Sequence, residues 1–404
     1  MSQYSDYKRF LIDVFEEDIL DDVENEEDFS NNFIGGISRF YTHGEFENFV
    51  TEVRNRFLRL KNVYWGSDRD KEIIKDKLKL LLSNNDNWSG YYFELIAWDF
   101  FNNITFHHNS EIECVLPASD TFASNLNNRQ QSSLDGALEL NNKFYYEIKS
   151  LNDVPVTQID SIILQAKRQT RPDDFLDYTY EFQSDIDYQL LTNQDTRRQI
   201  VTDISETIEN IRITKSIHLG NTYINFRFFY SPQRIKTNVS FYSPYRHSLN
   251  YKYFFLKNFD QLTINHPNIL VYVIHPWTNS ILNSFNQMDK IFFRAVARRV
   301  FCQVTRENDI LLRNIFSGDN YSCDLSVASV AKKITGIVFL VDRSIGDSFQ
   351  NPRQYSMINL KSYCYLNPNV DSSNAFSQLD KDILQDCLPR ESCEEFDNFI
   401  FDNY

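Results

Sequence analysis

Three charged side chains near the middle of the chain have the types and spacing that suit metal-assisted hydrolysis. They are Asp135, Glu147 and Lys149. Carboxylate oxygens are the ligands that hard divalent cations such as Mg²⁺ bind, and water completes the shell. A metal ion held in this way lowers the pKa of its bound water and offsets negative charge on a phosphodiester.

The residue pattern indicates that two of these charges share one face of a strand. Residues 134–151 read as a strand, a turn at residues 141–142 and a second strand. Side chains two residues apart in a strand point the same way, so Glu147 and Lys149 lie on one face and Ile148 on the other. Burying either charge alone would be costly, so the two are paired, bound to a metal or placed at an open edge.

In a metal site, Asp135 and Glu147 would hold the ion together with the backbone carbonyl of Ile148. Lys149 would orient the attacking water or stabilise the developing negative charge. The residues leave a plainer alternative open. It is a solvated hairpin with a surface ion pair, because Asp and Glu-x-Lys at such spacing are common.

The register of the hairpin decides whether Asp135 joins the other two charges. A two-residue turn at residues 141–142 would set Asp135 opposite Ile148, on the wrong face. A three-residue loop, or a bulge at Gly136, would set it opposite Glu147. We expect one of these two arrangements.

A helix is predicted on each side of the hairpin. The first runs from Gly90 to about residue 102 and is apolar except for two acids, one of which is Glu94. A glutamate in a buried helix needs a partner, so Glu94 is either a site residue or a hydrogen-bonded structural carboxylate. The second helix starts at Pro155, ends near residue 170, and carries Gln165 and Lys167 as candidate site residues.

This arrangement resembles the PD-(D/E)XK nuclease superfamily. The resemblance rests on Asp135-Gly and Glu147-Ile-Lys149 in a hairpin, on Glu94 in the preceding helix, and on the helix that follows. It covers residues 85–170, and Leu134 stands where the motif has proline. It implies an α/β fold whose mixed β-sheet is flanked by helices, with a restriction-endonuclease-like core. The implied catalytic residues are Asp135, Glu147, Lys149, Glu94 and Gln165, and the implied cofactor is Mg²⁺ or Mn²⁺, held by Asp135, Glu147 and Ile148.

The rest of the pattern divides the chain into five parts. They are an N-terminal helical region with an acidic start (1–84), the first part of the nuclease core (85–170), a basic aromatic, β-rich insertion (171–265), the remaining core strands and helix (266–370), and an acidic C-terminal tail (371–404). Within the fourth part we expect strands at 268–275, 334–342 and 357–366, and an amphipathic helix at 290–305.

The net charge of −15 does not exclude nucleic acid as a partner, because the acidity is concentrated at the two ends of the chain. Residues 211–259 contain no Asp or Glu, and their basic and aromatic residues alternate. Such a stretch can neutralise phosphates and stack on bases. The alternative is a β-rich subdomain whose aromatic residues form the core and whose basic residues lie on the solvent-exposed face. The candidate nucleic-acid-binding residues are Arg227, Arg234, Lys236, Arg246 and Lys167.

Several other classes lack support in the sequence. No apolar run is long enough to cross a bilayer and the first residues lack the pattern of a signal peptide, so we expect a cytoplasmic protein with no membrane partner. The six cysteines form no CxxC pair, which argues against disulfides and a zinc site. No Walker or GxGxxG motif is present.

The expected function is a metal-dependent endonuclease that hydrolyses phosphodiester bonds, with DNA preferred over RNA. The resemblance implies a role in restriction or phage defence, with a homo-oligomer or a defence-system partner protein. One alternative is a non-catalytic module that binds nucleic acid or protein on a nuclease-like fold. Another is an interaction protein whose acidic ends bind a basic partner or mimic DNA.

Overall fold

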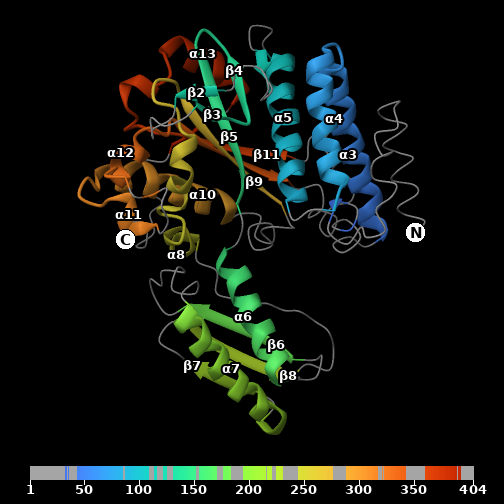
Figure 1. The fold of residues 1–404 in the computed structure, drawn as a ribbon, viewed down its shortest axis with the longest axis vertical. Helices are drawn as coiled ribbons and strands as arrows, with labels where there is room; N and C mark the ends of the chain where they lie inside the picture. The colour runs from blue at the N-terminus through green and yellow to red at the C-terminus, as the bar shows by residue number, and fades with distance from the viewer. Residues whose placement is uncertain are drawn as a thin grey trace. The chain divides into compact units, whose positions relative to one another are not determined.

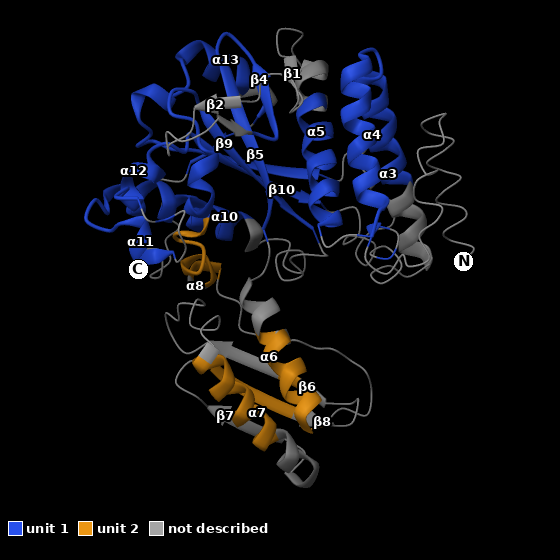
Figure 2. Ribbon diagram, viewed as in Figure 1, with its two compact units in different colours: residues 1–152, 255–395 blue, residues 153–254, 396–404 orange. Residues whose placement is uncertain are grey.

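The computed structural model divides into two compact units, one of residues 1–152 and 255–395, the other of residues 153–254 and 396–404 (Figure 2). Most of the second unit is therefore a continuous insertion in the chain of the first. The structure describes residues 32, 33, 35, 43–84, 87–108, 113–115, 122–124, 131–151, 154–170, 176–182, 194–214, 216–220, 224–230, 244–275, 288–316, 321, 323–342, 360–388 and 390–392.

The first unit is built on a mixed sheet with the strand order β1-β4-β5-β9-β10-β11-β12 in the described residues. Strands β5, β9 and β10 are parallel, whereas β4 pairs antiparallel with β5, and β11 with β10. The bounds are β1 Glu113–Val115, β4 Gly136–Glu139, β5 Lys143–Ser150, β9 Asn268–Ile274, β10 Gly336–Asp342, β11 Leu360–Leu366 and β12 Arg390–Glu391. This sheet confirms the predicted α/β class with a mixed sheet.

The central strands of this sheet are covered on both faces. Every residue of β9 and β10 is buried, which is typical of parallel strands between two helical layers. Both strands were expected from their apolar runs and both are present. Strand β11 begins at Leu360, and residues 357–359 of the expected third strand lie outside the described residues.

Helices α3 (His43–Tyr64), α4 (Asp68–Leu82) and α5 (Trp88–His108) stand side by side (Figure 1). Together with α13 (Gln378–Cys387) they contribute to one hydrophobic core with the strands. Its members include Val53, Phe57, Ile74, Leu78, Ile96, Tyr146, Ile148, Val271, Leu340 and Leu384. The predicted helical character of the N-terminal region is thus confirmed for α3 and α4, and residues 1–31 lie outside the described residues.

The opposite face of the sheet packs against aromatic side chains from two helical segments. Phe255 of the 3₁₀ segment η2 (Phe254–Gln261) lies 4.6 Å from the Tyr272 ring centroid, and Phe293 of α10 (Met288–Arg298) stacks on Phe339 at 4.3 Å. The predicted helix at 290–305 is present, although its last part changes to a π-helical turn, η3 (Arg299–Gln303), and a 3₁₀ turn, η4 (Val304–Arg306). Two short helices follow, α11 (Leu312–Ile315) and α12 (Val327–Ala331).

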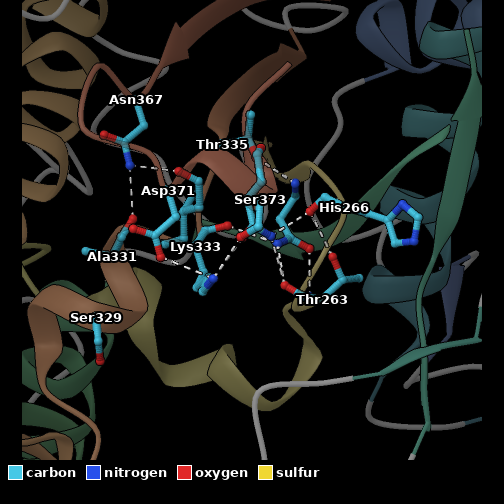
Figure 3. Close-up of polar contacts among 12 residues, drawn as sticks. Thr263, His266, Ser329, Ala331, Lys333, Thr335, Asn367, Asp371 and Ser373 are labelled. Carbon is cyan, nitrogen blue, oxygen red and sulfur yellow. Dashed lines mark hydrogen bonds and ion pairs between the residues drawn. The ribbon is translucent and has the colours of Figure 1, made fainter. Parts of the chain in front are cut away.

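A buried polar cluster fixes the starts of β9 and β10 (Figure 3). The amide of Asn374, which is fully buried, donates to the carbonyls of Thr263 and His266 at 3.0 and 2.7 Å. The same side chain accepts from Lys333 at 3.1 Å. Asn268, at the start of β9, donates to the carbonyls of Thr263 and Lys333. These amides satisfy backbone carbonyls from two segments, residues 263–266 and Lys333, so the cluster is a structural one.

The C-terminal part of the first unit differs from the expected acidic tail. Residues 372–391 form a 3₁₀ turn, η7 (Ser372–Asn374), helix α13 and strand β12. Asp380 is fully buried and accepts hydrogen bonds from the backbone N–H and the side-chain amide of Asn142 at 3.2 and 2.8 Å. This acid therefore stabilises the fold by satisfying a distant loop. Residues 393–404 lie outside the described residues.

The second unit is a two-layer α/β module. Its strands follow the antiparallel order β6-β8-β7, and its helices α6 and α7 share one core with them. That core contains Ile159, Ile162, Ile163, Ala166, Ile200, Val201, Ile204, Ile224, Phe226 and Phe228. The bounds are α6 Val154–Thr170, β6 Leu176–Phe182, α7 Gln194–Thr214, β7 Ser216–Gly220, β8 Ile224–Tyr230 and α8 Pro244–Leu249.

Two sequence-based boundaries change because of this module. Helix α6 was assigned to the nuclease core, but its apolar face packs against α7 and β8 within the second unit. The pattern of residues 171–210 favours helix in part, which α7 confirms, but the β-rich character expected of the insertion as a whole is wrong, because α7 and α8 lie in it beside its three strands. A short separate ribbon is formed by β2 (Phe122–Ser124) and β3 (Gln131–Ser133). No described helix is long and apolar enough to span a membrane.

Candidate active site

The β4–β5 hairpin has the register that brings the two carboxylates together. Glu139 pairs with Lys143, so three residues, 140–142, form the loop. Gly136 then pairs with Tyr146, and the next position outward sets Asp135 opposite Glu147. The expected three-residue loop is confirmed, and β4 needs no bulge at Gly136.

Contacts with α13 and α5, and one close approach within the hairpin, support this register. Asp380 of α13 holds Asn142 in the loop. The ring of Tyr146 crosses Gly136 so closely that a Cβ there would lie 2.2 Å from the Tyr146 Cζ. Tyr146 in turn stacks on Phe101 of α5 at 4.5 Å. Glycine at position 136 is therefore required for close approach, because a larger residue would overlap an aromatic ring.

Asp135 is held at the end of β4 by its backbone and its side chain. The indole Nε1 of Trp98, on α5, donates to the Asp135 carbonyl at 2.9 Å. The Ile148 backbone N–H donates to Asp135 Oδ2 at 2.8 Å. The carboxylate thus takes the place of a backbone acceptor where the strand ends.

The backbone of Ile148 lies on the same edge as Asp135. Tyr145 and Leu151 donate their N–H groups to β9, at the carbonyls of Pro267 and Val273. Because strand residues alternate in direction, the N–H and carbonyl of Ile148 face the β4 side instead. The backbone carbonyl expected to help bind a metal is therefore on the Asp135 side of β5.

Glu147 and Lys149 form a partly buried ion pair on the sheet face opposite α5. Lys149 Nζ lies 2.5 Å from Glu147 Oε1, and the Glu147 side chain is 4% exposed against 31% for Lys149. Burial, followed by the negative charge of Asp135, raises the pKa of Glu147 to about 8, while Lys149 opposes that rise. Burial lowers the pKa of Lys149, but the charges of Glu147 and Asp135 outweigh burial and raise it.

Glu94, on α5, belongs to the same cluster of charges. Its side chain is 14% exposed and pairs with Lys77 of α4. Burial and the charge of Asp135 raise the pKa of Glu94 to about 7, while Lys77 opposes that rise. The hairpin therefore brings together Asp135, Glu147 and Lys149, and Glu94 interacts with Asp135 and Lys149 through its charge.

The donor set suits a hard cation, although it is small. Among the described residues, no group of three or more His, Cys, Asp or Glu side chains could hold a metal ion. Two carboxylates and the Ile148 carbonyl remain as donors. Glu147 Oε2 is buried and accepts no hydrogen bond within the described part of the chain. A buried carboxylate oxygen without a donor is one that a cation would satisfy, so these oxygens fit Mg²⁺ or Mn²⁺.

The other candidate residues lie in the second unit or outside the described residues. Gln165 is exposed and Lys167 half-buried on α6, and Arg227 is exposed on β8. Arg246 belongs to α8, and its side chain is not described. Arg234 and Lys236 lie outside the described residues. The roles of Gln165 and of the basic residues therefore stay predictions.

The aromatic residues of the basic stretch are mostly core where they are described. Phe226, Phe228, Tyr245 and Tyr251 are buried. Arg227 points to the other face of β8 and is exposed. For these four rings, the arrangement favours the alternative in which the aromatic residues form a core and the basic residues face solvent. It does not favour stacking of these rings on bases.

Three residues of the site's surroundings had no recognisable signal in the sequence. Lys77 is one of several lysines on an amphipathic helix, Trp98 is one of many aromatic residues on an apolar helix, and Asp380 lies in a strongly acidic segment. Each acts through a partner that is between 17 and 238 residues away, as in Lys77 with Glu94 and Asp380 with Asn142.

No protein-family model, no curated protein and no solved structure matches this chain. The functional interpretation of the site is consequently based on its own geometry and charge.

Proposed function

We propose that this chain is a metal-dependent endonuclease that hydrolyses phosphodiester bonds, with DNA preferred over RNA. The observation that carries the proposal is the hairpin register, which sets Asp135 opposite Glu147 while Lys149 pairs with Glu147. The proposal includes the restriction-endonuclease-like identity of the mixed-sheet core and a role in restriction or phage defence. A cytoplasmic location and a homo-oligomer or defence-system partner belong to the same proposal.

The charge and position of each residue of the site suggest a separate role for it in metal binding or in substrate binding. Asp135, Glu147 and the carbonyl of Ile148 would hold Mg²⁺ or Mn²⁺, which when bound would lower the pKa of water and offset phosphate charge. The partly exposed side chain of Lys149 would offer its ammonium to a negatively charged oxygen of the substrate. Glu94 adds a third carboxylate to the local field and so favours a cation.

A second candidate function is a non-catalytic module that binds nucleic acid or protein on this fold. The observation that favours it is the lack, in the described part of the chain, of a three-residue metal-binding group. In such a module, Lys149 would be the permanent partner of Glu147, and the pair would serve stability alone.

The deciding experiment is cleavage of supercoiled plasmid and of a long RNA by the purified chain in Mg²⁺, Mn²⁺ or EDTA. The nuclease proposal expects cleavage in either metal and none in EDTA. Glu147→Gln should abolish both cleavage and Mn²⁺ binding measured by calorimetry. Lys149→Ala should abolish cleavage while Mn²⁺ still binds.

The same hairpin provides a matched control. Glu139 and Lys143 form an ion pair of 3.0 Å near the loop, on the partly exposed side of the hairpin. Glu139→Gln should cleave at the wild-type rate. If Glu147→Gln and Lys149→Ala melt normally and also cleave at that rate, the nuclease assignment fails and the binding module is favoured.

A further inference from the structure

The ion pair between Lys77 and Glu94 joins the N-terminal helical region to the candidate active site. Lys77 belongs to α4, which precedes the segment that resembles the nuclease superfamily. Its Nζ contacts the Glu94 carboxylate and lies over the rings of Tyr91 and Trp98, at 5.1 and 5.9 Å from their centroids. Three side chains of α5 therefore hold one ammonium group.

Helix α4 presents this lysine from a fixed position. Its apolar residues Ile74, Leu78 and Leu81 are fully buried in the core that α5 also enters. At its N-terminus, Ser67 caps the helix by accepting from the Asp70 backbone N–H at 3.3 Å. Lys77 is thus carried by a packed helix rather than by a loop.

Trp98 connects the same ammonium to Asp135. One edge of its indole donates to the Asp135 carbonyl at 2.9 Å, and its ring is one of the two beneath Lys77. Displacement of Lys77 would therefore affect both Glu94 and the contact that holds Asp135.

The charges of the cluster explain why Glu94 needs such a partner. Glu94 and Asp135 repel each other, and the Glu94 side chain is mostly removed from water. A carboxylate in that position is costly unless a cation compensates for it. Lys77 supplies that cation from α4 by direct contact, and Lys149 on β5 adds a weaker favourable charge.

We propose that Lys77 is a positioning residue of the site, which holds in place the Glu94 carboxylate and the Trp98 indole that donates to the Asp135 carbonyl during phosphodiester cleavage. The inference rests on the nuclease function proposed above and extends it. It makes the N-terminal helical region part of the active site, since α4 provides a side chain on which the geometry of the site depends.

The first test compares Lys77→Met with Lys77→Arg. Methionine keeps an unbranched side chain of similar length but removes the charge. We expect kcat for plasmid cleavage to fall about 10- to 100-fold, as is common when a partner of an active-site group is removed. Arginine keeps the cation and should recover most of the rate. Lys75→Met is the matched control, because Lys75 lies on the same helix and pairs at 3.6 Å with the exposed Glu72.

The second test is a double-mutant cycle with Glu94→Gln. If Lys77 acts through Glu94, Lys77→Met should cause little further loss in the Glu94→Gln background. Binding of a fluorescent DNA duplex in EDTA should be unchanged by Lys77→Met. A lysine that contacted substrate phosphate itself would instead weaken this binding and would lower the rate in both backgrounds.

The outcomes separate this inference from the proposed function. Cleavage by the wild type together with a full rate for Lys77→Met overturns the positioning role alone. Additive losses with weakened DNA binding also overturn it, in favour of a direct substrate contact. A wild type that cleaves no phosphodiester in Mg²⁺ or Mn²⁺ overturns both proposals.

Discussion

At the scale of single residues, the site consists of a few charged and polar side chains that lie close together and are partly removed from water. Glu147 has one oxygen beside Lys149 and another that is buried without a hydrogen-bond donor in the described part of the chain. One carboxylate oxygen of Asp135 accepts a hydrogen bond from the Ile148 N–H. The ionised form of Glu147 is therefore disfavoured in the folded chain when no metal is present.

The first prediction concerns the pH dependence of stability in EDTA. The pKa of Glu147 is raised from 4.5 to about 8, so between these values the folded state binds more protons than the unfolded state. Its contribution to the free energy of unfolding is present at low pH and is lost as pH rises through about 8. Glu147→Gln removes this dependence, which cannot exceed about 1.4 kcal/mol per pH unit.

The measurement is urea unfolding of both proteins at several pH values between 5 and 8. The wild type should lose stability relative to Glu147→Gln as pH rises. Parallel curves for the two proteins would show that Glu147 titrates at its ordinary pKa and is not held in a dry site.

The second prediction concerns the indole N–H of Trp98. Trp98→Phe keeps an aromatic ring but leaves the Asp135 carbonyl without its donor. We expect the free energy of unfolding to fall by about 1–3 kcal/mol and plasmid cleavage to fall about tenfold or more. Trp88→Phe, at the start of the same helix, should leave cleavage unchanged. Equal cleavage by both variants would contradict a role for Trp98 in placing Asp135.

At the scale of secondary-structure elements, the hairpin depends on helices that lie far from it in the chain. Helix α5 supplies Trp98 and Phe101, and α13 supplies Asp380. The hairpin is therefore held by contacts from one helix before it and one helix after it in sequence. This matters because a slip of one residue would turn every side chain of the strand to the other face.

The third prediction tests the link between α13 and the loop. Asp380→Ala removes the acceptor for both donors of Asn142 and for the hydroxyl of Ser377, the N-cap of α13. The expected cost is about 1–3 kcal/mol of unfolding free energy. Cleavage should fall as well, because the loop holds the register that places Asp135 opposite Glu147.

The control for this variant lies on the same helix. Asp382 is exposed and accepts a hydrogen bond of 2.8 Å from the side-chain amide of Gln378, which is also exposed. Asp382→Ala should therefore melt and cleave like the wild type. If Asp380→Ala also does so, the loop keeps its register by its own conformation.

At the scale of the whole first unit, a buried ion pair joins the N-terminal helices to the far end of the sheet. Arg56 of α3 donates to Asp342, the last residue of β10, at 2.9 Å and to the Tyr92 hydroxyl at 2.8 Å. The two charged side chains are 2% and 0% exposed. His275, after β9, lies beside the same carboxylate at 3.8 Å, and burial lowers the pKa of His275 to about 3.

The fourth prediction follows from the cost of a lone buried charge. Arg56→Met leaves Asp342 without its main cation and should lower the free energy of unfolding by about 3–5 kcal/mol. Adding Asp342→Asn removes the stranded charge and should recover part of that loss. Urea unfolding of the single and double variants measures both effects. A double variant with the summed loss of the two single variants would show that the two side chains do not interact.

The sequence by itself determined the features that depend on local pattern. Apolar runs predicted β9 and β10, helical spacing predicted α3 and α4, and alternation predicted that Glu147 and Lys149 share a face. Placing Asp135 opposite Glu147 required a three-residue loop or a bulge at Gly136, and the structure has the three-residue loop. These predictions succeeded because periodicity is set by the geometry of the helix and the strand.

The tertiary structure determined which segment each buried face of a helix or strand packs against. The apolar face of α6 fitted a core helix, yet it packs against α7 and β8 in a second unit. An acidic C-terminal segment suggested a tail, yet Asp380 is buried against Asn142, 238 residues away. Lys77 and Trp98 acquire their positions in the site in the same way. The spacing of side chains along an element indicates that one of its faces is buried or charged. Which segment contacts that face depends on packing between residues far apart in the sequence, and local spacing carries no information about that segment.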